Sequence, residues 1–203
     1  MYYKIRFKKK RGARMSTATT NNTKRTLKDI DKIRWITVTA LFLGLNIAVS
    51  SFGIPVPGGH LYLCDTVICT AALLLDPIAA FVVGGVGSFL GDFFFYPAPM
   101  YVSLVTHGLQ AVVIALIVGR VHRGVNKKYF VTSLIATLIG AVIMVVGYTL
   151  GKTYVYATFE YAMIKLPYEI AQALLGVVGS LVLCFKCGLI KIFNRMEYGV
   201  ISK

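Results

Sequence analysis

The feature that most constrains this chain is an 85-residue stretch, from Trp35 through Gly119, that contains no lysine or arginine. A soluble domain carries roughly a quarter charged residues, whereas only 15% of these 203 residues are charged. A stretch without cations cannot provide a water-exposed surface, but it can form several helices inside a bilayer. The sequence therefore predicts an all-α, polytopic membrane protein and not a soluble enzyme.

Six apolar segments predict six transmembrane helices. They cover residues 35–52, 61–75, 78–95, 100–119, 129–150 and 163–193. Asp76-Pro77 predicts a tight turn and a helix start, because proline disfavours helix in the residue before it and suits the first helical position. Pro167 is expected in or near the first turn of the last helix. The predicted domains are a basic, disordered tail (1–33), the membrane domain (34–195) and a second tail (196–203).

The cations predict the topology. Of 22, twelve lie between Lys4 and Arg34, four between Arg120 and Lys128, and four from Lys186 onward. By the positive-inside rule, both termini face the cytoplasm of a plasma membrane. The loops 53–60, 96–99 and 151–161 then lie outside. Because the basic groups flank apolar segments and do not form one patch, the net charge of +14 does not indicate a nucleic-acid partner.

Motifs for several enzyme classes are absent from the sequence. It contains no GxxxxGK[ST] phosphate loop, no GxSxG nucleophile elbow and no HExxH metal motif. The four cysteines are interpreted as small buried residues, because the CxxC pair Cys184/Cys187 has no second pair or histidine nearby. The chain is expected to have no catalytic residues, metal or cofactor of its own.

Polar residues inside the apolar segments are the candidates for binding. A charge at the bilayer centre costs about 2.5–3.5 kcal/mol on insertion scales. Two pairs with i, i+3 spacing share a helix face, His107/Gln110 and Glu169/Gln172. We expect such groups to converge in a ligand pocket open to the outside; hydrogen bonds between helices are the alternative. The whole set is Asn46, Asp65, Asp92, His107, Gln110, Glu169 and Gln172.

Aromatic residues gather in the predicted outside loops. Tyr96 and Tyr101 flank the prolines of the outside loop at 96–99 and are candidates to cover a flat ligand. A lipid-facing aromatic belt is the alternative.

In the first segment, Ala40, Gly44 and Ala48 form a small-residue face suited to packing within the protein or against another membrane subunit.

Five motifs in this order resemble the substrate-binding S components of energy-coupling factor (ECF) vitamin transporters. They are Pro-Gly-Gly-His-Leu-Tyr-Leu-Cys-Asp (57–65), Ala-Ala-Leu-Leu-Leu-Asp-Pro (71–77), Val-Gly-Gly-Val-Gly-Ser-Phe-Leu-Gly-Asp (83–92), Thr-His-Gly-Leu-Gln (106–110) and Leu-Pro-Tyr-Glu-Ile-Ala-Gln (166–172). The resemblance covers about residues 35–195. It implies a receptor that binds a vitamin or its precursor from outside.

The resemblance also implies partners: a transmembrane coupling subunit and two cytoplasmic ATPases that supply the energy. It gives the first loop the role of a gate, with Gly59 and His60 among the substrate-binding residues. The family's docking motif is often Ala-x-x-x-Ala, whereas this chain has Ala40-x-x-x-Gly44. Glycine still permits close approach of two helices, so this face is still expected to dock on the coupling subunit.

The substrate is predicted from the polar and aromatic residues. They suit a planar, uncharged or weakly basic heteroaromatic ring such as hydroxymethylpyrimidine or pyridoxine. Pantothenate would need a cation for its carboxylate, and Lys152, Lys165 and His60 are those near the outside. A larger, riboflavin-sized ligand is a further alternative. A membrane scaffold without a ligand and a stand-alone secondary carrier are the alternatives from other classes.

Overall fold

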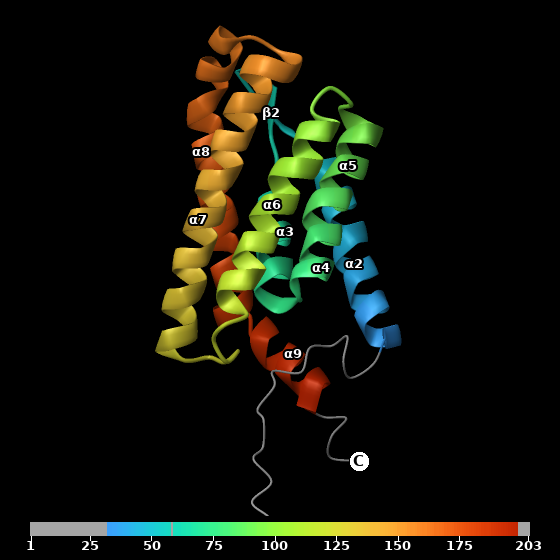
Figure 1. The fold of residues 1–203 in the computed structure, drawn as a ribbon, viewed down its shortest axis with the longest axis vertical. Coiled ribbons are helices and arrows are strands. Elements are labelled where there is room, and N and C mark those ends of the chain that lie inside the picture. The colour runs from blue at the N-terminus through green and yellow to red at the C-terminus, as the bar shows by residue number, and fades with distance from the viewer. Residues whose placement is uncertain (1–31, 58, 199–203) are drawn as a thin grey trace, which may run out of the picture.

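A computed structural model describes residues 32–57 and 59–198, which form a helical bundle with a small hairpin at one end (Figure 1). Of the predicted tail at 1–33, all but Lys32 and Ile33 lies outside the described residues, as do residues 199–203 of the second tail. In chain order the described elements are α2 (Lys32–Ser50), β1 (Ile54–Val56), β2 (Gly59–Leu61), α3 (Cys64–Leu74), α4 (Pro77–Phe81), η1 (Val82–Val86), α5 (Gly87–Phe95), α6 (Met100–Val118), α7 (Lys127–Gly151), η2 (Lys152–Tyr156), α8 (Phe159–Leu181), η3 (Val182–Lys186) and α9 (Leu189–Tyr198).

Five continuous helices in the described part are long and apolar enough to cross a bilayer. They are α2, α4–η1–α5, α6, α7–η2 and α8–η3, where each η segment is a π-helical turn inside a longer helix. The prediction of a polytopic helical membrane protein is confirmed at this level. The number of six spans and the cytoplasmic side of the termini stay predictions.

The second predicted segment is the one that differs most. Its helix, α3, has 11 residues, so at 1.5 Å per residue it spans about half of a bilayer core of roughly 30 Å. Ten of those residues are buried. A hairpin precedes this helix and pairs Ile54 with Leu61 and Val56 with Gly59. The loop expected at 53–60 is therefore an antiparallel β-hairpin, and the fold is not purely α-helical.

The third predicted outside loop is also shorter than expected. Instead of a loop over 151–161, α7–η2 continues to Tyr156 and α8 begins at Phe159, where the Thr158 hydroxyl accepts a hydrogen bond from the Tyr161 amide at 3.3 Å. Lys152 remains helical and inside the bundle because Glu169 of α8 pairs with its charge. Since α8 starts early, Pro167 lies well inside the helix and not in its first turn.

The last predicted helix divides in two. The long helix ends with η3 at Lys186, and Gly188 has a φ of 78°, a conformation that favours glycine. After this turn α9 packs across the end of the bundle (Figure 1), where Phe193 contacts Phe42 of α2 at a ring distance of 6.1 Å.

The expected turn at Asp76-Pro77 is confirmed, because the Asp76 carboxylate caps α4 and also accepts a hydrogen bond from the Trp35 indole.

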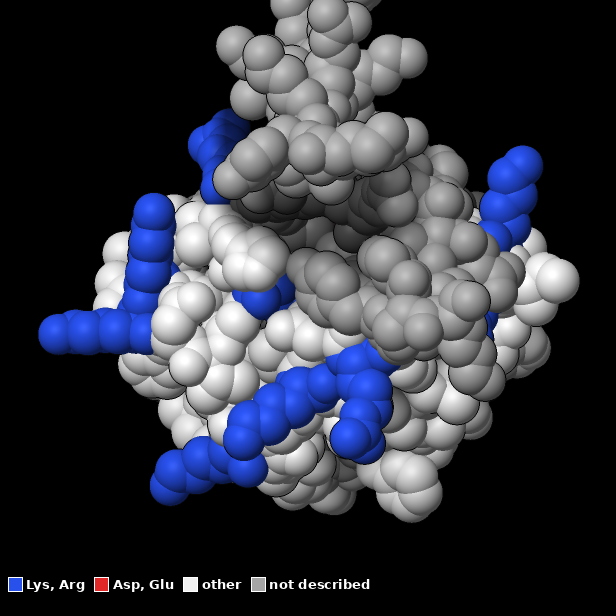
Figure 2. Space-filling model, turned by 90° about the horizontal axis from the view of Figure 1, so that it is seen from below, with Lys and Arg blue, Asp and Glu red and all other residues white. Residues whose placement is uncertain are grey.

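The end of the bundle that carries α9 is basic. Figure 2 looks at this end and shows lysine and arginine side chains extending outward, with no Asp or Glu in view among the residues drawn in colour. The exposed cations on the elements that meet here are Lys32, Arg34, Arg120, Lys127, Lys128, Lys186, Lys191 and Arg195. We call this the basic end, and the opposite end, with the hairpin, the hairpin end.

Glycines of η1 let this helix lie directly on the backbone of α6. A Cβ added to Gly84 would come within 2.8 Å of the His107 carbonyl oxygen and of the Ala111 Cβ. We expect Gly84→Ala to lower the free energy of unfolding by about 1–3 kcal/mol, because the helices must separate. Thermal unfolding in detergent measures this. Gly44→Ala is the matched control, because its Cβ would meet no atom within 4 Å, and a melting temperature shared by both variants would contradict the prediction.

Candidate functional site: a pocket at the hairpin end

A pocket lies between α5, α6, α7–η2 and α8, and the start of α3 and the residue after the hairpin close its inner side. Five of the eleven predicted binding residues line it: Asp92, Tyr96, His107, Glu169 and Gln172. Tyrosines dominate the remaining surface: Tyr62, Tyr148, Tyr156 and Tyr161. The pocket is therefore lined by tyrosines together with acidic and basic side chains.

A network of hydrogen bonds forms the floor of the pocket. Asp65, at the start of α3, accepts hydrogen bonds from the side-chain amides of Gln172 (2.7 Å) and Gln110 (3.0 Å). The Gln172 side-chain oxygen accepts one from the Tyr62 backbone amide at 3.0 Å. The floor thus joins α3, α6 and α8 to the residue that leaves the hairpin.

His107 completes this network on α6. Its Nδ1 lies 2.7 Å from the Gln110 side-chain oxygen, while the Gln110 nitrogen donates to Asp65. That assignment makes Nδ1 the donor nitrogen in this contact. The ring packs edge-on against Tyr148 at 5.2 Å. His107 is therefore fixed in orientation and lines the pocket.

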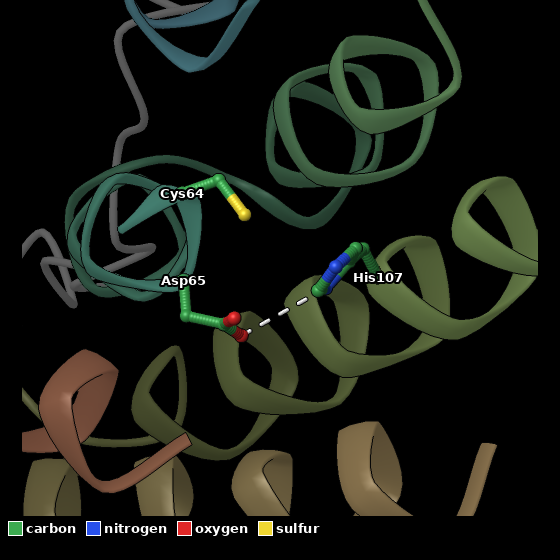
Figure 3. Close-up of side chains that lie close together, drawn as sticks. All are labelled: Cys64, Asp65 and His107. Carbon is green, nitrogen blue, oxygen red and sulfur yellow. Dashed lines mark ion pairs between the residues drawn. The ribbon is translucent and has the colours of Figure 1, made fainter. Parts of the chain in front are cut away.

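Three potential metal ligands meet in this floor (Figure 3). Cys64, Asp65 and His107 are buried and offer ligand atoms within 4.8 Å of one another, and Nδ1 of His107 lies 3.8 Å from Asp65. Both Asp65 oxygens already accept amide hydrogens, and Nδ1 is paired with Gln110. These contacts account for the arrangement as a hydrogen-bonded floor.

A buried ion pair joins α7–η2 to α8. The Lys152 ammonium pairs with Oε1 of Glu169, and 1% and 3% of the two side chains are exposed. The ammonium also lies 5.0 Å from the centre of the Tyr148 ring, in a cation–π contact. The second oxygen of Glu169, Oε2, has no hydrogen-bond partner among the described residues. The carboxylate therefore retains a free acceptor in the pocket wall.

The wall opposite is held by a second polar chain. The Ser103 hydroxyl donates to Asp92 of α5 and is also hydrogen-bonded to the Tyr148 hydroxyl of α7. Asp92 and Glu169 therefore place carboxylates on two different walls, with Tyr148 between them. Both carboxylates have a neighbouring polar partner, which offsets part of the cost of their burial.

Lys165 is the second charged residue, with Glu169, that α8 contributes to the pocket. It is half-buried, lines the pocket, and makes no ion pair or hydrogen bond with any residue in the described part.

Lys152 and Lys165 were predicted to lie near the outside, and were not among the predicted binding residues. Their spacing could have identified them, because Tyr148, Lys152 and Tyr156 repeat every four residues on one helix face, as do Tyr161, Lys165 and Glu169.

Six predicted binding residues do not line the pocket. Asp65 and Gln110 lie behind the lining residues, in the hydrogen-bond network that includes Gln172. Asn46 donates to the Val83 carbonyl at 2.8 Å and to Ser88 at 3.3 Å, and so joins α2 to η1. Gly59 and His60 lie in β2, with His60 exposed, and Tyr101 is 64% exposed beside Phe89.

The small-residue face of α2 points away from the bundle. Ala40, Gly44 and Ala48 are all exposed, and the space around Gly44 is open. The opposite face of α2 packs on α5 and η1, where Gly87 and Gly91 give room to Asn46 and Ser50. Within the described residues, the small-residue face is available for another helix.

Comparison with known proteins identifies the family to which this arrangement corresponds. Residues 31–187 match the family described as "ECF-type riboflavin transporter, S component". The chain is also 32% identical over 143 residues to a Pyrococcus woesei protein described as "Uncharacterized protein in gap 3'region". That alignment covers 70% of this chain and 87% of the relative.

Proposed function

Because the chain belongs to the family of ECF-type riboflavin transporter S components, we propose that it captures a small heteroaromatic vitamin or precursor, such as hydroxymethylpyrimidine or pyridoxine, for import. Membership of this family makes the chain a substrate-binding subunit of a membrane transporter and not an enzyme. The proposal adds the ligand, the side from which it enters and the residues that bind it.

The observation that carries the proposal is the buried Glu169 carboxylate with a free acceptor oxygen in a tyrosine-lined pocket. A ring nitrogen that carries a proton, or an exocyclic amino group, would donate to this oxygen in a charge-assisted hydrogen bond. The tyrosine rings would cover the faces of a flat ring. The lining includes Tyr96, Pro99 and Tyr156, which lie at the helix ends of the hairpin end, and this end faces outward if the basic end faces the cytoplasm.

Two other vitamins are competing ligands of the same site. Riboflavin is named in the description of the family. Pantothenate is favoured by one observation, the unpaired Lys165 ammonium in the pocket, which would attract its carboxylate. Hydroxymethylpyrimidine and pyridoxine are preferred because both an aromatic wall and a free carboxylate oxygen suit a ring with a donor nitrogen.

Native mass spectrometry of the purified protein tests the proposal. We expect the protein to retain or bind one small heteroaromatic compound when it is offered pyridoxine, hydroxymethylpyrimidine, pantothenate and riboflavin. Glu169→Ala should abolish this binding, whereas Cys187→Ala, at an exposed position near the basic end, should leave it unchanged. A protein that binds none of these compounds would contradict the proposal, and selective binding of riboflavin or pantothenate would replace its ligand.

We also propose that the transporter contains a transmembrane coupling subunit and two ATPases, and that Ala40, Gly44 and Ala48 dock on the coupling subunit. Gly44→Leu should reduce complex formation at least about tenfold, because a bulky side chain prevents close helix approach. Co-purification of the subunits measures this. Gly44→Ala is the control, and ligand binding by the isolated Gly44→Leu subunit should be unchanged. An intact complex with Gly44→Leu would exclude this docking face.

A further inference from the structure

Three charged groups in the pocket have hydrogen-bonding capacity that the described residues do not use. Oε2 of Glu169 has no partner. The Lys152 ammonium has one ion pair, to Oε1 of the same carboxylate, and Lys165 has none. Buried charged groups without partners are costly. A ligand that matches this pocket must therefore offer both a donor for the carboxylate and an acceptor for an ammonium.

The positions of these groups limit how large the matching part of the ligand is. Lys165 and Glu169 have i, i+4 spacing on α8, which places their Cβ atoms roughly 5–6 Å apart on one face. Both side chains line the pocket. Lys152 holds Oε1 from the neighbouring helix, so Oε2 is the oxygen left for the ligand. The complementary donor and acceptor of the ligand would therefore meet two neighbouring side chains on one face of α8.

We infer, on the premise of the proposed vitamin-binding function, that the ligand is a dipolar hydroxypyridine, with its ring nitrogen bound to Glu169 and its phenolic oxygen to Lys165. In such a ring the oxygen can lose its proton while the nitrogen gains one, which gives opposite charges on one flat molecule. Charge-assisted hydrogen bonds of this kind are stronger than neutral ones. Pyridoxine has this chemistry.

The same arrangement disfavours the other ligands. An aminopyrimidine can donate to Glu169 and accept from Lys165 through a ring nitrogen or its hydroxyl, but it offers no anionic oxygen, so its contact with Lys165 would be the weaker one. Pantothenate offers a carboxylate to Lys165 but has neither a cationic nitrogen for Glu169 nor an aromatic face for the tyrosines that line the pocket. Two basic and two acidic residues line the pocket, Lys152, Lys165, Asp92 and Glu169, so their formal charges balance and a dipolar ligand without net charge preserves that balance.

A binding cycle with pyridoxine and 3-deoxypyridoxine, which lacks only the phenolic oxygen, tests the inference. Loss of this oxygen should weaken binding to the unmodified protein at least about tenfold, as expected for a charge-assisted contact. Lys165→Met should weaken pyridoxine binding by a similar factor and bind the two compounds equally. Lys186→Met, which removes an exposed cation at the basic end, should retain the full difference between them.

Three other results would contradict the Lys165 contact, the ligand class or the proposed function. Equal discrimination by Lys165→Met and the unmodified protein would exclude the contact with Lys165. Tighter binding of hydroxymethylpyrimidine than of pyridoxine would exclude the hydroxypyridine class and leave the vitamin-binding function in place. Binding of no vitamin in the panel would contradict the proposed function itself. Thermal unfolding checks that Lys165→Met is folded, and Lys165→Gln replaces it in the cycle if it is not.

Discussion

Replacing Lys152 with methionine is expected to lower the free energy of unfolding by about 3–5 kcal/mol, the usual cost of removing one partner of a buried ion pair. Only 1% of Lys152 and 3% of Glu169 are exposed. The variant would leave the Glu169 carboxyl without its cation inside the bundle. It would also remove the contact between α7–η2 and α8 on which the shape of the pocket wall depends.

Thermal unfolding of the purified protein in detergent measures this effect. Two control variants test whether the broken ion pair causes it. Lys165→Met should be much less destabilising, because Lys165 has no ion pair with a described residue. The double variant Lys152→Met/Glu169→Leu should recover much of the loss, because it removes both buried charges together. If the single and double variants unfold at the same temperature, the ion pair does not support this part of the fold.

Apolar patterning predicted the positions of the long helices well. The segments expected at 78–95 and 100–119 are helical over Pro77–Phe95 and Met100–Val118. Such helices are specified locally, because an apolar run of this length satisfies its own backbone hydrogen bonds in a bilayer. The capped start at Asp76-Pro77 was equally local. The sequence alone was sufficient for these features.

Features that depend on distant partners were not predictable in the same way. The chain around Lys152 contains glycine, polar and aromatic residues typical of a loop, and it is helical because Glu169, 17 positions later, pairs with the lysine. The hairpin likewise depends on a contact between the Tyr62 amide and Gln172 of α8. Local propensity does not contain such long-range contacts.

The same distinction applies to the candidate site. Helical spacing correctly placed Glu169 and Gln172 on one face, and both line the pocket. Spacing cannot show which face of a helix another element covers. Asn46 is as polar and as buried as these residues, yet its amide is used between α2 and η1. Only packing distinguishes a polar residue that joins helices from one that faces a ligand.

Asp65 is the residue whose replacement we expect to affect ligand binding and hairpin structure together. Two side-chain amides donate to its carboxylate, from Gln110 and Gln172. Asp65→Ala would remove this acceptor from both buried amides, at about 1–3 kcal/mol for each donor left unsatisfied, and Gln110 would keep only a contact of 3.7 Å to the Cys69 sulfur. Gln172 would also lose the contact that orients its oxygen toward the Tyr62 amide. We therefore expect a less stable protein, a loss of vitamin binding, and a hairpin that opens more often.

Hydrogen–deuterium exchange followed at residues 54–62 separates this mechanism from general destabilisation. In Asp65→Ala, exchange at the hairpin should accelerate more than exchange in α6, because the floor of the pocket holds the hairpin through Gln172. Asp65→Asn should be intermediate, since it keeps the shape and one acceptor oxygen but turns a second donor toward the glutamine amides. Val105→Ala, at a position 65% exposed on α6, is the control that should change neither binding nor exchange. Normal binding and an unchanged hairpin in Asp65→Ala would show that the floor does not couple the two.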